Sequence, residues 1–193
     1  MKLVFATHNQ HKFTEVHALM PPHIELVSLA QIGCFDDIPE TESTIEGNAV
    51  LKAQFIKNKY GLDCFADDTG LEVAALDGAP GVYSARYAGQ GGNSEANIRK
   101  LLENLHGLEN RSAQFKTVIA LSLEEDLHLF TGICQGNITQ QPRGDGGFGY
   151  DPVFQAKGSH KTFAEITSEE KGRIGHRGKA IRALVEYLFE LHD

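Results

Sequence analysis

Apolar residues along this chain alternate between two spacings, and this alternation is the strongest constraint on its fold. Short runs of strand-forming residues, such as Leu3 to Ala6, precede stretches with helical spacing, such as Phe13 to Met20. Strands that alternate with helices pack as a sheet covered by helices, so the pattern predicts an α/β fold. Residues 111–122 and 128–139 are long strand-type segments joined by an acidic turn, which predicts an antiparallel hairpin in an otherwise crossover-connected, mixed sheet.

Three further helices and a broken strand complete the predicted pattern. Helices are expected over Thr44 to Tyr60, from about Ser94, and from Ile181 to the chain end. Cys64 to Ala66 and Leu71 to Ala74 are expected to be separate strands, because the polar residues 67–70 interrupt them. No repeat or long linker appears, so residues 1–193 are expected to form a single domain.

Composition excludes several classes of function. A net charge of −8, with no run of five like charges, disfavours binding to duplex nucleic acid or to an anionic membrane. The three cysteines are widely spaced and odd in number, so buried thiols are expected rather than disulfides or a zinc site. The first apolar stretch is too short for a signal peptide, and we expect a cytoplasmic protein.

The segment Thr7-His8-Asn9-Gln10-His11-Lys12 lies where a strand passes into a helix. The N–H groups and dipole of a helix start favour an anion, and Lys12 adds a full positive charge, so a triphosphate would suit this segment. Alternatively, Asn9 only caps the helix and Lys12 is solvated. His8 and His11 lack further metal ligands nearby, so we expect them to face solvent.

Acidic residues provide a second candidate site. Asp67 and Asp68 follow an apolar strand and would lie at a sheet edge, where two carboxylates repel unless a cation intervenes. Hard oxygen ligands beside phosphate favour Mg²⁺. An ordinary turn is the alternative, but Glu40 and Glu42, just before the second helix, add to the acidic character.

Two later segments are open to two interpretations each. Residues 144–149 match G-x-G-x-x-G, but Pro152 prevents the helix that a dinucleotide fingerprint requires. The segment is therefore a mobile or tightly turned loop, and its aromatic rings and Asp151 make either a wall for a planar base or a plain glycine-rich connection. The basic residues within 171–179 either meet a phosphate or carbonyl oxygen or are surface charges at a helix start, and they do not form a P-loop.

Six segments in this order resemble the inosine triphosphate pyrophosphatase family, which hydrolyses non-canonical purine nucleoside triphosphates. They are Thr7-x-Asn9-x-x-Lys12; Pro39-Glu40 with Gly47-Asn48-Ala49-x-x-Lys52-Ala53; Ala66-Asp67-Asp68-Thr69-Gly70-Leu71; Gly78-Ala79-Pro80-Gly81-x-Tyr83-Ser84-Ala85-Arg86-Tyr87; Gly146-Gly147-Phe148-Gly149-Tyr150-Asp151-Pro152; and His176-Arg177-Gly178-Lys179-Ala180. The resemblance implies an elongated mixed sheet flanked by helices, two lobes with a central cleft, and a homodimer. It also implies Mg²⁺-dependent hydrolysis of ITP, dITP and XTP to the monophosphate and pyrophosphate.

The resemblance also implies roles for individual residues. Glu40 and Asp68 would hold the metal, with Asp68 as the catalytic base. The substrate would be held by Thr7, His8, Asn9, Gln10, His11, Lys12, Lys52 and Thr69 and, in the base pocket, by Phe148, Gly149, Tyr150, Asp151, Lys171, His176 and Arg177. The chain departs from the usual pattern at His8, Gly47 and Gly175.

Two functions of other classes compete with this interpretation. A nucleotide-binding regulator without turnover would gain nothing from Glu40, Asp67 and Asp68 beside its anion unless a metal bridged them. A structural or protein-interaction domain would leave the glycine-rich and basic segments without a role. We therefore predict a nucleotide-pool pyrophosphohydrolase.

Overall fold

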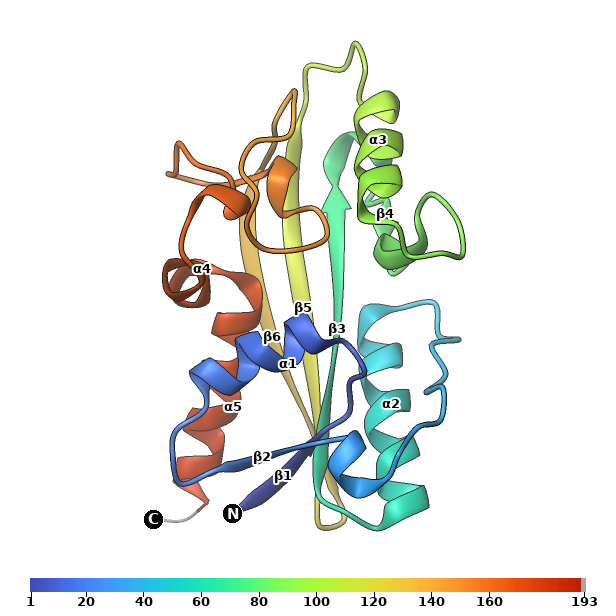
Figure 1. Cartoon of the computed structure of the whole chain (residues 1–193), viewed down its shortest axis with the longest axis vertical. Helices are drawn as coiled ribbons and strands as arrows, with labels where there is room; N and C mark the ends of the chain where they lie inside the picture. The colour runs from blue at the N-terminus through green and yellow to red at the C-terminus, as the bar shows by residue number, and fades with distance from the viewer. Residues whose placement is uncertain (192–193) are drawn as a thin grey trace. The chain divides into compact units, whose positions relative to one another are not determined.

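The computed structural model describes residues 1–191, and within these residues it contains helices on a single mixed sheet (Figure 1). The α-helices are α1 (Gln10–Leu19), α2 (Ile45–Tyr60), α3 (Ser94–Asn104), α4 (Ser168–Ile174) and α5 (His176–Glu190). The strands are β1 (Lys2–Phe5), β2 (Glu25–Ser28), β3 (Cys64–Val73), β4 (Pro80–Gly81), β5 (Ser112–Leu123), β6 (Asp126–Ile138) and β7 (Phe154–Ala156). Five short 3₁₀ turns connect these elements within residues 1–191.

The sheet has the order β2-β1-β3-β5-β6-β7, and β4 pairs with β3. The first strands are parallel, with Val4 opposite Val27 and Phe5 opposite Phe65. Strands β5 and β6 are neighbours joined by a tight turn, and β7 pairs antiparallel with β6. The predicted α/β class, mixed sheet and hairpin are therefore confirmed.

Strand β3 contradicts the prediction of two short strands separated by a polar break. It runs without interruption from Cys64 to Val73, between β1 and β5, so Asp67 and Asp68 lie in a central strand and not at a sheet edge. Successive side chains of a strand point to opposite faces, so the two carboxylates are directed apart. Each is then neutralised by its own cations, which allows both to be buried in the sheet.

The chain folds into two compact units that interleave in the sequence. Unit 1 contains Met1–Asp68, Thr117–Gly132 and the segment from Arg177 onward. Its apolar core joins β1, β3 and β5 to α1 and α5 through side chains such as Phe5, Phe65 and Leu184. Helix α2 packs on the other face of the sheet, where the Cys64 thiol donates to the Ala53 carbonyl oxygen at 3.2 Å.

Unit 2 contains Thr69–Lys116 and Ile133–His176. Its core joins α3 to β3, β5 and β6 and to the segment after β6 through side chains such as Leu101, Phe115 and Phe154. The core residues of β3 and β5 alternate with polar residues that point to the opposite face of the sheet. The end of the glycine-rich segment and α4 pack against the same core through Tyr150 and Ile174.

Several elements had no clear signal in the sequence. Strands β2, β4 and β7 are two to four residues long, and α4 lies inside the basic segment expected to precede the last helix. Helix α5 begins at His176, five residues before the apolar repeat, and its described end is Glu190. The three cysteines are buried thiols, as predicted. Among the helices within residues 1–191, none combines the length and apolar character of a membrane span.

Candidate active site

The loop from Thr7 to Lys12 caps helix α1. Asn9 is the N-cap and accepts the Lys12 N–H at 3.1 Å, while the Thr7 hydroxyl accepts the Asn9 N–H at 3.1 Å. His8, Asn9, Gln10 and His11 are exposed, and the His8 ring lies 2.8 Å from the Asp36 carbonyl oxygen. The capping interpretation of Asn9 is therefore correct, and the exposed helix start also keeps the geometry that suits an anion.

Lys12 belongs to a buried ionic network in unit 1. Its ammonium lies 3.0 Å from Asp67 Oδ1, and the other oxygen of Asp67 accepts from Arg177 Nε at 3.1 Å. Arg177 Nη1 also donates to Glu15 Oε2 at 2.5 Å. Asp67 is thus shared by a lysine from α1 and an arginine from α5. Lys12 is not simply solvated, and Asp67 is occupied by cations of the chain itself.

Lys52 forms the centre of a second ionic network of unit 1. It extends from α2, and its ammonium lies 2.6 Å from Glu40 Oε1 and 3.4 Å from Asp68 Oδ1. Lys52 and Asp68 are buried, whereas the Glu40 side chain is 38% exposed. Asp68 Oδ2 is buried without a hydrogen-bond partner in the part of the chain that the structure describes. The structure thus brings Glu40, Lys52 and Asp68 together, as the resemblance implies.

We call the side chains of these two networks the charge cluster: Lys12, Glu15, Glu40, Lys52, Asp67, Asp68 and Arg177. With all groups ionised it has three cations and four carboxylates, hence a net charge of −1. The net negative charge of the cluster would repel a polyphosphate. One added divalent cation would make the net charge positive.

The oxygen donors of the cluster fit a magnesium ion. Within residues 1–191, no three His, Cys, Asp and Glu side chains gather into a complete protein cage. Mg²⁺ does not require one, because it is usually bound by one or two carboxylates together with substrate phosphates and water. Asp68 Oδ2, which has no hydrogen-bond partner among residues 1–191, and the partly exposed carboxylate of Glu40, which contacts Lys52, are the oxygens that would hold it.

Burial and neighbouring charges shift the pKa values of the cluster in opposite directions. Burial alone would raise the pKa of Asp67, but Lys12 and Arg177 hold it well below the ordinary range. Burial raises the pKa of Asp68, and Lys52 offsets this only in part. Burial likewise lowers the pKa of Lys12, whereas for Lys52 the effect of burial is overcome by Asp68 and Glu40, which raise its pKa. Adjacent aspartates are therefore suited to different tasks.

Unit 2 holds the other predicted residues around a buried ion pair. Lys171, from α4, lies 2.6 Å from Asp151 Oδ2, which also accepts the Phe148 N–H at 2.9 Å. The ammonium lies 4.7 Å from the centre of the Phe148 ring and 5.7 Å from that of Phe163. A side chain at Gly147 would place its Cβ on the Asp151 carboxylate, so glycine is required there.

Aromatic rings continue this arrangement. The His176 ring stacks on Phe115 with 4.5 Å between centroids and lies 6.1 Å from Phe163. We call Phe115, Phe148, Asp151, Phe163, Lys171 and His176 the aromatic cage. Flat side chains around a fixed charge suit a planar heterocycle.

The glycine-rich segment is a tight turn rather than a mobile loop. Gly146 N–H donates to the Ala164 carbonyl oxygen at 3.0 Å, and a Cβ on Gly144 or Gly146 would collide with the Ala164 backbone. Gly149 takes a left-handed conformation with φ of 61°. Tyr150 is 5% exposed and its hydroxyl donates to the Ser84 carbonyl oxygen at 2.7 Å.

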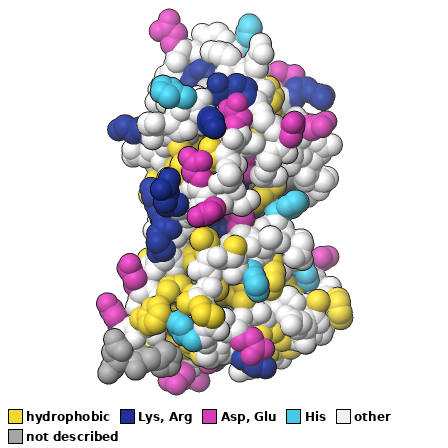
Figure 2. All heavy atoms as spheres, turned by 60° about the vertical axis from the view of Figure 1, so that its left-hand side comes forward, with side chains coloured by type: hydrophobic (Ala, Val, Ile, Leu, Met, Phe, Trp, Pro, Cys, Tyr) yellow, Lys and Arg dark blue, Asp and Glu magenta, His cyan; other side chains and the backbone are white. Residues whose placement is uncertain are grey.

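The structure divides the basic segment that the sequence presents as one cluster. Lys171 is buried in unit 2 and Arg177 in unit 1, whereas Arg173 and Lys179 are exposed. Figure 2 shows exposed Lys and Arg side chains gathered on one face of the molecule. Arg177, which was predicted to contact the base, uses its guanidinium to bind Asp67 and Glu15. The contact of Arg177 with a base stays a prediction, and so does the contact of Thr69, which follows Asp68 on β3, with substrate.

Two departures from the family pattern have a steric explanation. A Cβ on Gly175 would lie 2.6 Å from the Lys171 carbonyl oxygen, and one on Gly47 would lie 2.8 Å from the Glu42 Cβ. A side chain at position 175 would thus require the backbone near Lys171 to shift.

Glu15 was not predicted as a member of the site, because a lone acidic residue on a helix gives no signal of its buried partner Arg177, which lies 162 positions away.

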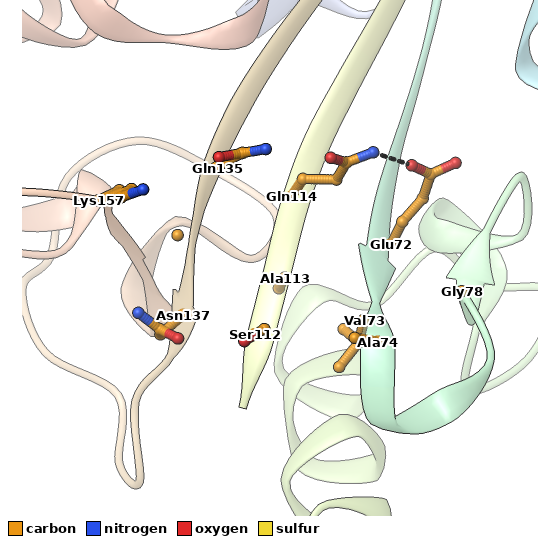
Figure 3. A pocket seen from close by; sticks show the side chains of 11 residues that line it. Glu72, Val73, Ala74, Gly78, Ser112, Ala113, Gln114, Gln135, Asn137 and Lys157 are labelled. Carbon is orange, nitrogen blue, oxygen red and sulfur yellow. Dashed lines mark hydrogen bonds between the residues drawn. The ribbon is translucent and has the colours of Figure 1, made fainter. Parts of the chain in front are cut away.

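A separate hollow of unit 2 is lined in part by residues of β3, β5 and β6 (Figure 3). It has a volume of about 560 Å³ and is lined by polar side chains such as Gln135 and Asn137, and Gln114 donates to Glu72 across it at 2.7 Å. None of the predicted site residues lines this hollow. The candidate site therefore rests on the charge cluster and the aromatic cage.

The charge cluster has the groups that suit a polyphosphate with a metal ion, and the aromatic cage has those that suit a planar base, so the chemistry of each site points to the class of nucleotide-binding proteins. Comparison with known proteins then identifies the family: the Ham1 family model matches residues 3–187, and the chain belongs to this family. It is 59% identical to a dITP/XTP pyrophosphatase of Christiangramia forsetii over 97% of this chain and 99% of that protein. It is 56% identical to a protein of the same name from Flavobacterium johnsoniae, over 97% and 98% of the two chains.

Solved structures agree with this assignment. The Staphylococcus aureus Ham1 protein superposes with a TM-score of 0.90 at 39% identity, covering 98% of this chain and 99% of that one. A HAM1 protein from Coxiella burnetii gives a TM-score of 0.91 at 39% identity, with the same coverage. The family resemblance and the fold class predicted from the sequence are thereby confirmed.

Proposed function

We propose that this protein is a pyrophosphohydrolase that converts ITP, dITP and XTP into the nucleoside monophosphate and pyrophosphate, with Mg²⁺ as cofactor. The observation that carries the proposal is the charge cluster. Its net charge of −1 would repel a polyphosphate, and a divalent cation removes this repulsion. The names of the Christiangramia and Flavobacterium relatives support the substrate class.

The phosphates are assigned to unit 1. Backbone N–H groups at the start of α1 and the Lys12 ammonium would bind the phosphate chain. Lys12 and Lys52 already contact carboxylates at 3.0 Å and 2.6 Å, so phosphate oxygens would share or replace these contacts. The lysine side chains are therefore held in place before substrate arrives, which reduces the entropy lost on binding.

Asp68 is assigned as the general base. Water attacks phosphorus, the bond between the α- and β-phosphates breaks, and the proton of the water passes to the Asp68 carboxylate. Burial raises the pKa of Asp68 and so makes it a better proton acceptor than an exposed aspartate. Mg²⁺ held by Glu40 and Asp68 would neutralise phosphate charge and acidify bound water.

The base is assigned to the aromatic cage. Phe148 and the neighbouring rings would stack on the purine, and His176 would donate to its 6-oxo group. The Asp151 carboxylate is already bound to Lys171 and the Phe148 N–H, so its first task is to fix the loop. This leaves Oδ2 of Asp151 poorly suited to accept from a 2-amino group of the base.

The activity is tested with a panel of ITP, dITP, XTP, GTP and ATP in the presence of Mg²⁺, with products separated by ion-exchange chromatography. We expect pyrophosphate and the monophosphate in equal amounts. Release of orthophosphate and a nucleoside diphosphate would refute the proposed bond cleavage. Excess EDTA should abolish turnover and added Mg²⁺ should restore it; full activity in EDTA would refute the metal assignment.

The assembly and location are also proposals. We propose a homodimer; support comes from the family resemblance and from Leu127 and Leu129, which are 41% and 48% exposed on one face of β6. Light scattering of the purified protein measures this directly. A cytoplasmic location is supported by the presence of three cysteine thiols, which fits a reducing compartment.

A further inference from the structure

The segment from Gly78 to Tyr87 matches the family, but the proposed mechanism gives it no role. Within unit 2, the Ser84 hydroxyl donates to the Gly81 carbonyl oxygen at 2.6 Å and accepts the Leu71 N–H at 2.9 Å. Ser84 is buried, so these bonds attach the turn firmly to β3. Its backbone carbonyl is thereby held in a defined position.

Asn97 on α3 holds the same segment from the other side. Its Nδ2 lies 3.1 Å from the Ala85 carbonyl oxygen and 3.4 Å from that of Ser84, and its Oδ1 accepts the Ala88 N–H at 2.7 Å. Asn97 is 5% exposed, so it contacts the segment through both ends of a buried amide. The segment is therefore clamped between α3 and β3.

Tyr150 connects this clamp to the aromatic cage. Its hydroxyl donates to the Ser84 carbonyl oxygen at 2.7 Å, and burial raises the pKa of Tyr150, so the hydroxyl stays a donor at neutral pH. The next residue is Asp151, which binds the Phe148 N–H and Lys171. The carbonyl of Ser84 thus accepts hydrogen bonds from α3 and from the loop that presents Phe148.

We infer that Asn97 and Tyr150 are positioning residues for base binding, which act through the Ser84 carbonyl to hold Phe148 and Asp151 in place. The inference rests on the proposed function, because it takes the cage as the base pocket. It gives Tyr150 a different role from the substrate contact that the resemblance implies. Neither residue is assigned a contact with substrate.

Competitive inhibition of ITP hydrolysis by two partial ligands tests this role. Inosine carries the base without phosphates, and tripolyphosphate carries the phosphates without a base. In Tyr150→Phe we expect the Ki for inosine to rise about fivefold, the effect of one unmade buried hydrogen bond. The Ki for tripolyphosphate should not change, because the phosphates are assigned to unit 1. Equal rises in both constants, or no rise for inosine, would overturn the inference.

A double-mutant cycle tests whether both residues act through the same carbonyl. Asn97→Ala should also raise the Ki for inosine, and the double variant should fall short of the product of the two single effects. Full multiplicativity would contradict a shared acceptor. If Asn97→Ala fails to fold, Tyr150→Phe alone decides, because it removes a single oxygen atom.

The chain supplies a matched control pair. Asn104, also on α3, donates to the Tyr87 hydroxyl at 2.7 Å in an exposed position. Tyr87→Phe removes the same hydroxyl as Tyr150→Phe, and Asn104→Ala removes the same amide from the same helix as Asn97→Ala, yet both should leave the Ki for inosine unchanged. An equal rise in these controls would show a general response of unit 2 and would overturn the inference.

Amide hydrogen exchange provides a readout that needs no activity. Residues 144–151 should exchange faster in Tyr150→Phe than in Tyr87→Phe, in protein without nucleotide. Failure of the wild type to hydrolyse any triphosphate would refute the proposed function, but it would leave this measurement intact. Equal exchange in the two variants would refute the positioning role itself.

Discussion

The charge cluster and the aromatic cage prepare for a ligand by opposite physical means. In the charge cluster, each cation is paired with a carboxylate of the chain, so we expect a ligand to bind by exchanging one ionic partner for another. In the aromatic cage, a single ion pair between Lys171 and Asp151 is internal, and of the rings around it Phe148 is partly exposed whereas Phe115 and Phe163 are buried in the core of unit 2.

This difference predicts where catalysis and where selectivity reside. Charges that respond to a metal and to phosphate act on groups that every nucleoside triphosphate shares, so the charge cluster is expected to control rate. Rings and fixed donors would act on the base, which is the part that distinguishes ITP from GTP. The cage is therefore expected to control selectivity among the triphosphates. Variants in each region therefore test the division.

The largest effect is expected at Asp68. Asp68→Asn keeps the shape of the side chain but removes the charge that accepts a proton and helps to hold Mg²⁺, so kcat should fall by about 10²-fold or more. Steady-state kinetics with ITP at saturating Mg²⁺ measure this. The cage is unchanged, so the order of preference among the triphosphates should be retained in the residual activity.

Asp63→Asn is the matched control for Asp68→Asn. Asp63 lies just before β3 in unit 1 and also binds a lysine, with Lys57 Nζ at 2.8 Å. Its carboxylate is 36% exposed and lies outside the charge cluster, so turnover should stay near that of the wild type. Near-normal kcat in a folded Asp68→Asn variant would remove Asp68 from the role of base.

The next effect concerns the choice of base. Hypoxanthine and xanthine present a 6-oxo acceptor, whereas adenine presents a donor there, so a donating His176 rejects ATP. Guanine shares the 6-oxo group but adds a 2-amino donor, and Oδ2 of Asp151 already accepts from Lys171 and the Phe148 N–H. We expect kcat/KM for ITP and XTP to exceed that for GTP and ATP at least about tenfold. Equal values for ITP and GTP would break the assignment of selectivity to the cage.

A smaller effect is expected at Lys12. Lys12→Ala removes a positive charge that would bind phosphate in the substrate as well as in the transition state. KM should therefore rise about fivefold to tenfold while kcat changes less. Measuring KM for ITP and GTP with the same variant sharpens the comparison, because both should rise by the same factor. A change in the ratio between the two substrates would show that the charge cluster also reads the base.

The sequence predicts which residue types form these sites better than it predicts which residues pair with one another. Local patterns were sufficient for the helix start at Asn9, the α/β class and the residue types of both sites, because these depend on near neighbours and on motif order. The continuous strand through Asp67 and Asp68 was missed, because its stability depends on Lys12 and Lys52, which lie far away in the sequence. Similarly, no local signal could divide the basic segment between Lys171 and Arg177.

The smallest expected effect separates the adjacent aspartates in the metal-free protein. The pKa of Asp67 is lowered on folding, so its charge stabilises the fold above its unfolded pKa of about 3.9, and this contribution is lost as pH falls through that value toward the folded pKa. The pKa of Asp68 is raised, so the stability linked to its protonation is lost as pH rises through the folded pKa.

Neutralising each aspartate should therefore have opposite consequences. At neutral pH in EDTA, Asp68→Asn should raise the Tm by about 2–4 °C, the shift that about 1 kcal/mol gives in a chain of this size, because burial disfavours the Asp68 charge and Lys52 keeps Glu40 as its partner at 2.6 Å. Asp67→Asn should lower the Tm, because it leaves Lys12 and Arg177 less well compensated, and should flatten the decline of stability with acid. Thermal unfolding followed by circular dichroism between about pH 3 and pH 7 measures both, spanning the ordinary carboxyl pKa range. A Tm that falls in both variants would show that Asp68 is a structural anchor like Asp67, and it would remove the contrast on which its assignment as a proton acceptor with a raised pKa depends.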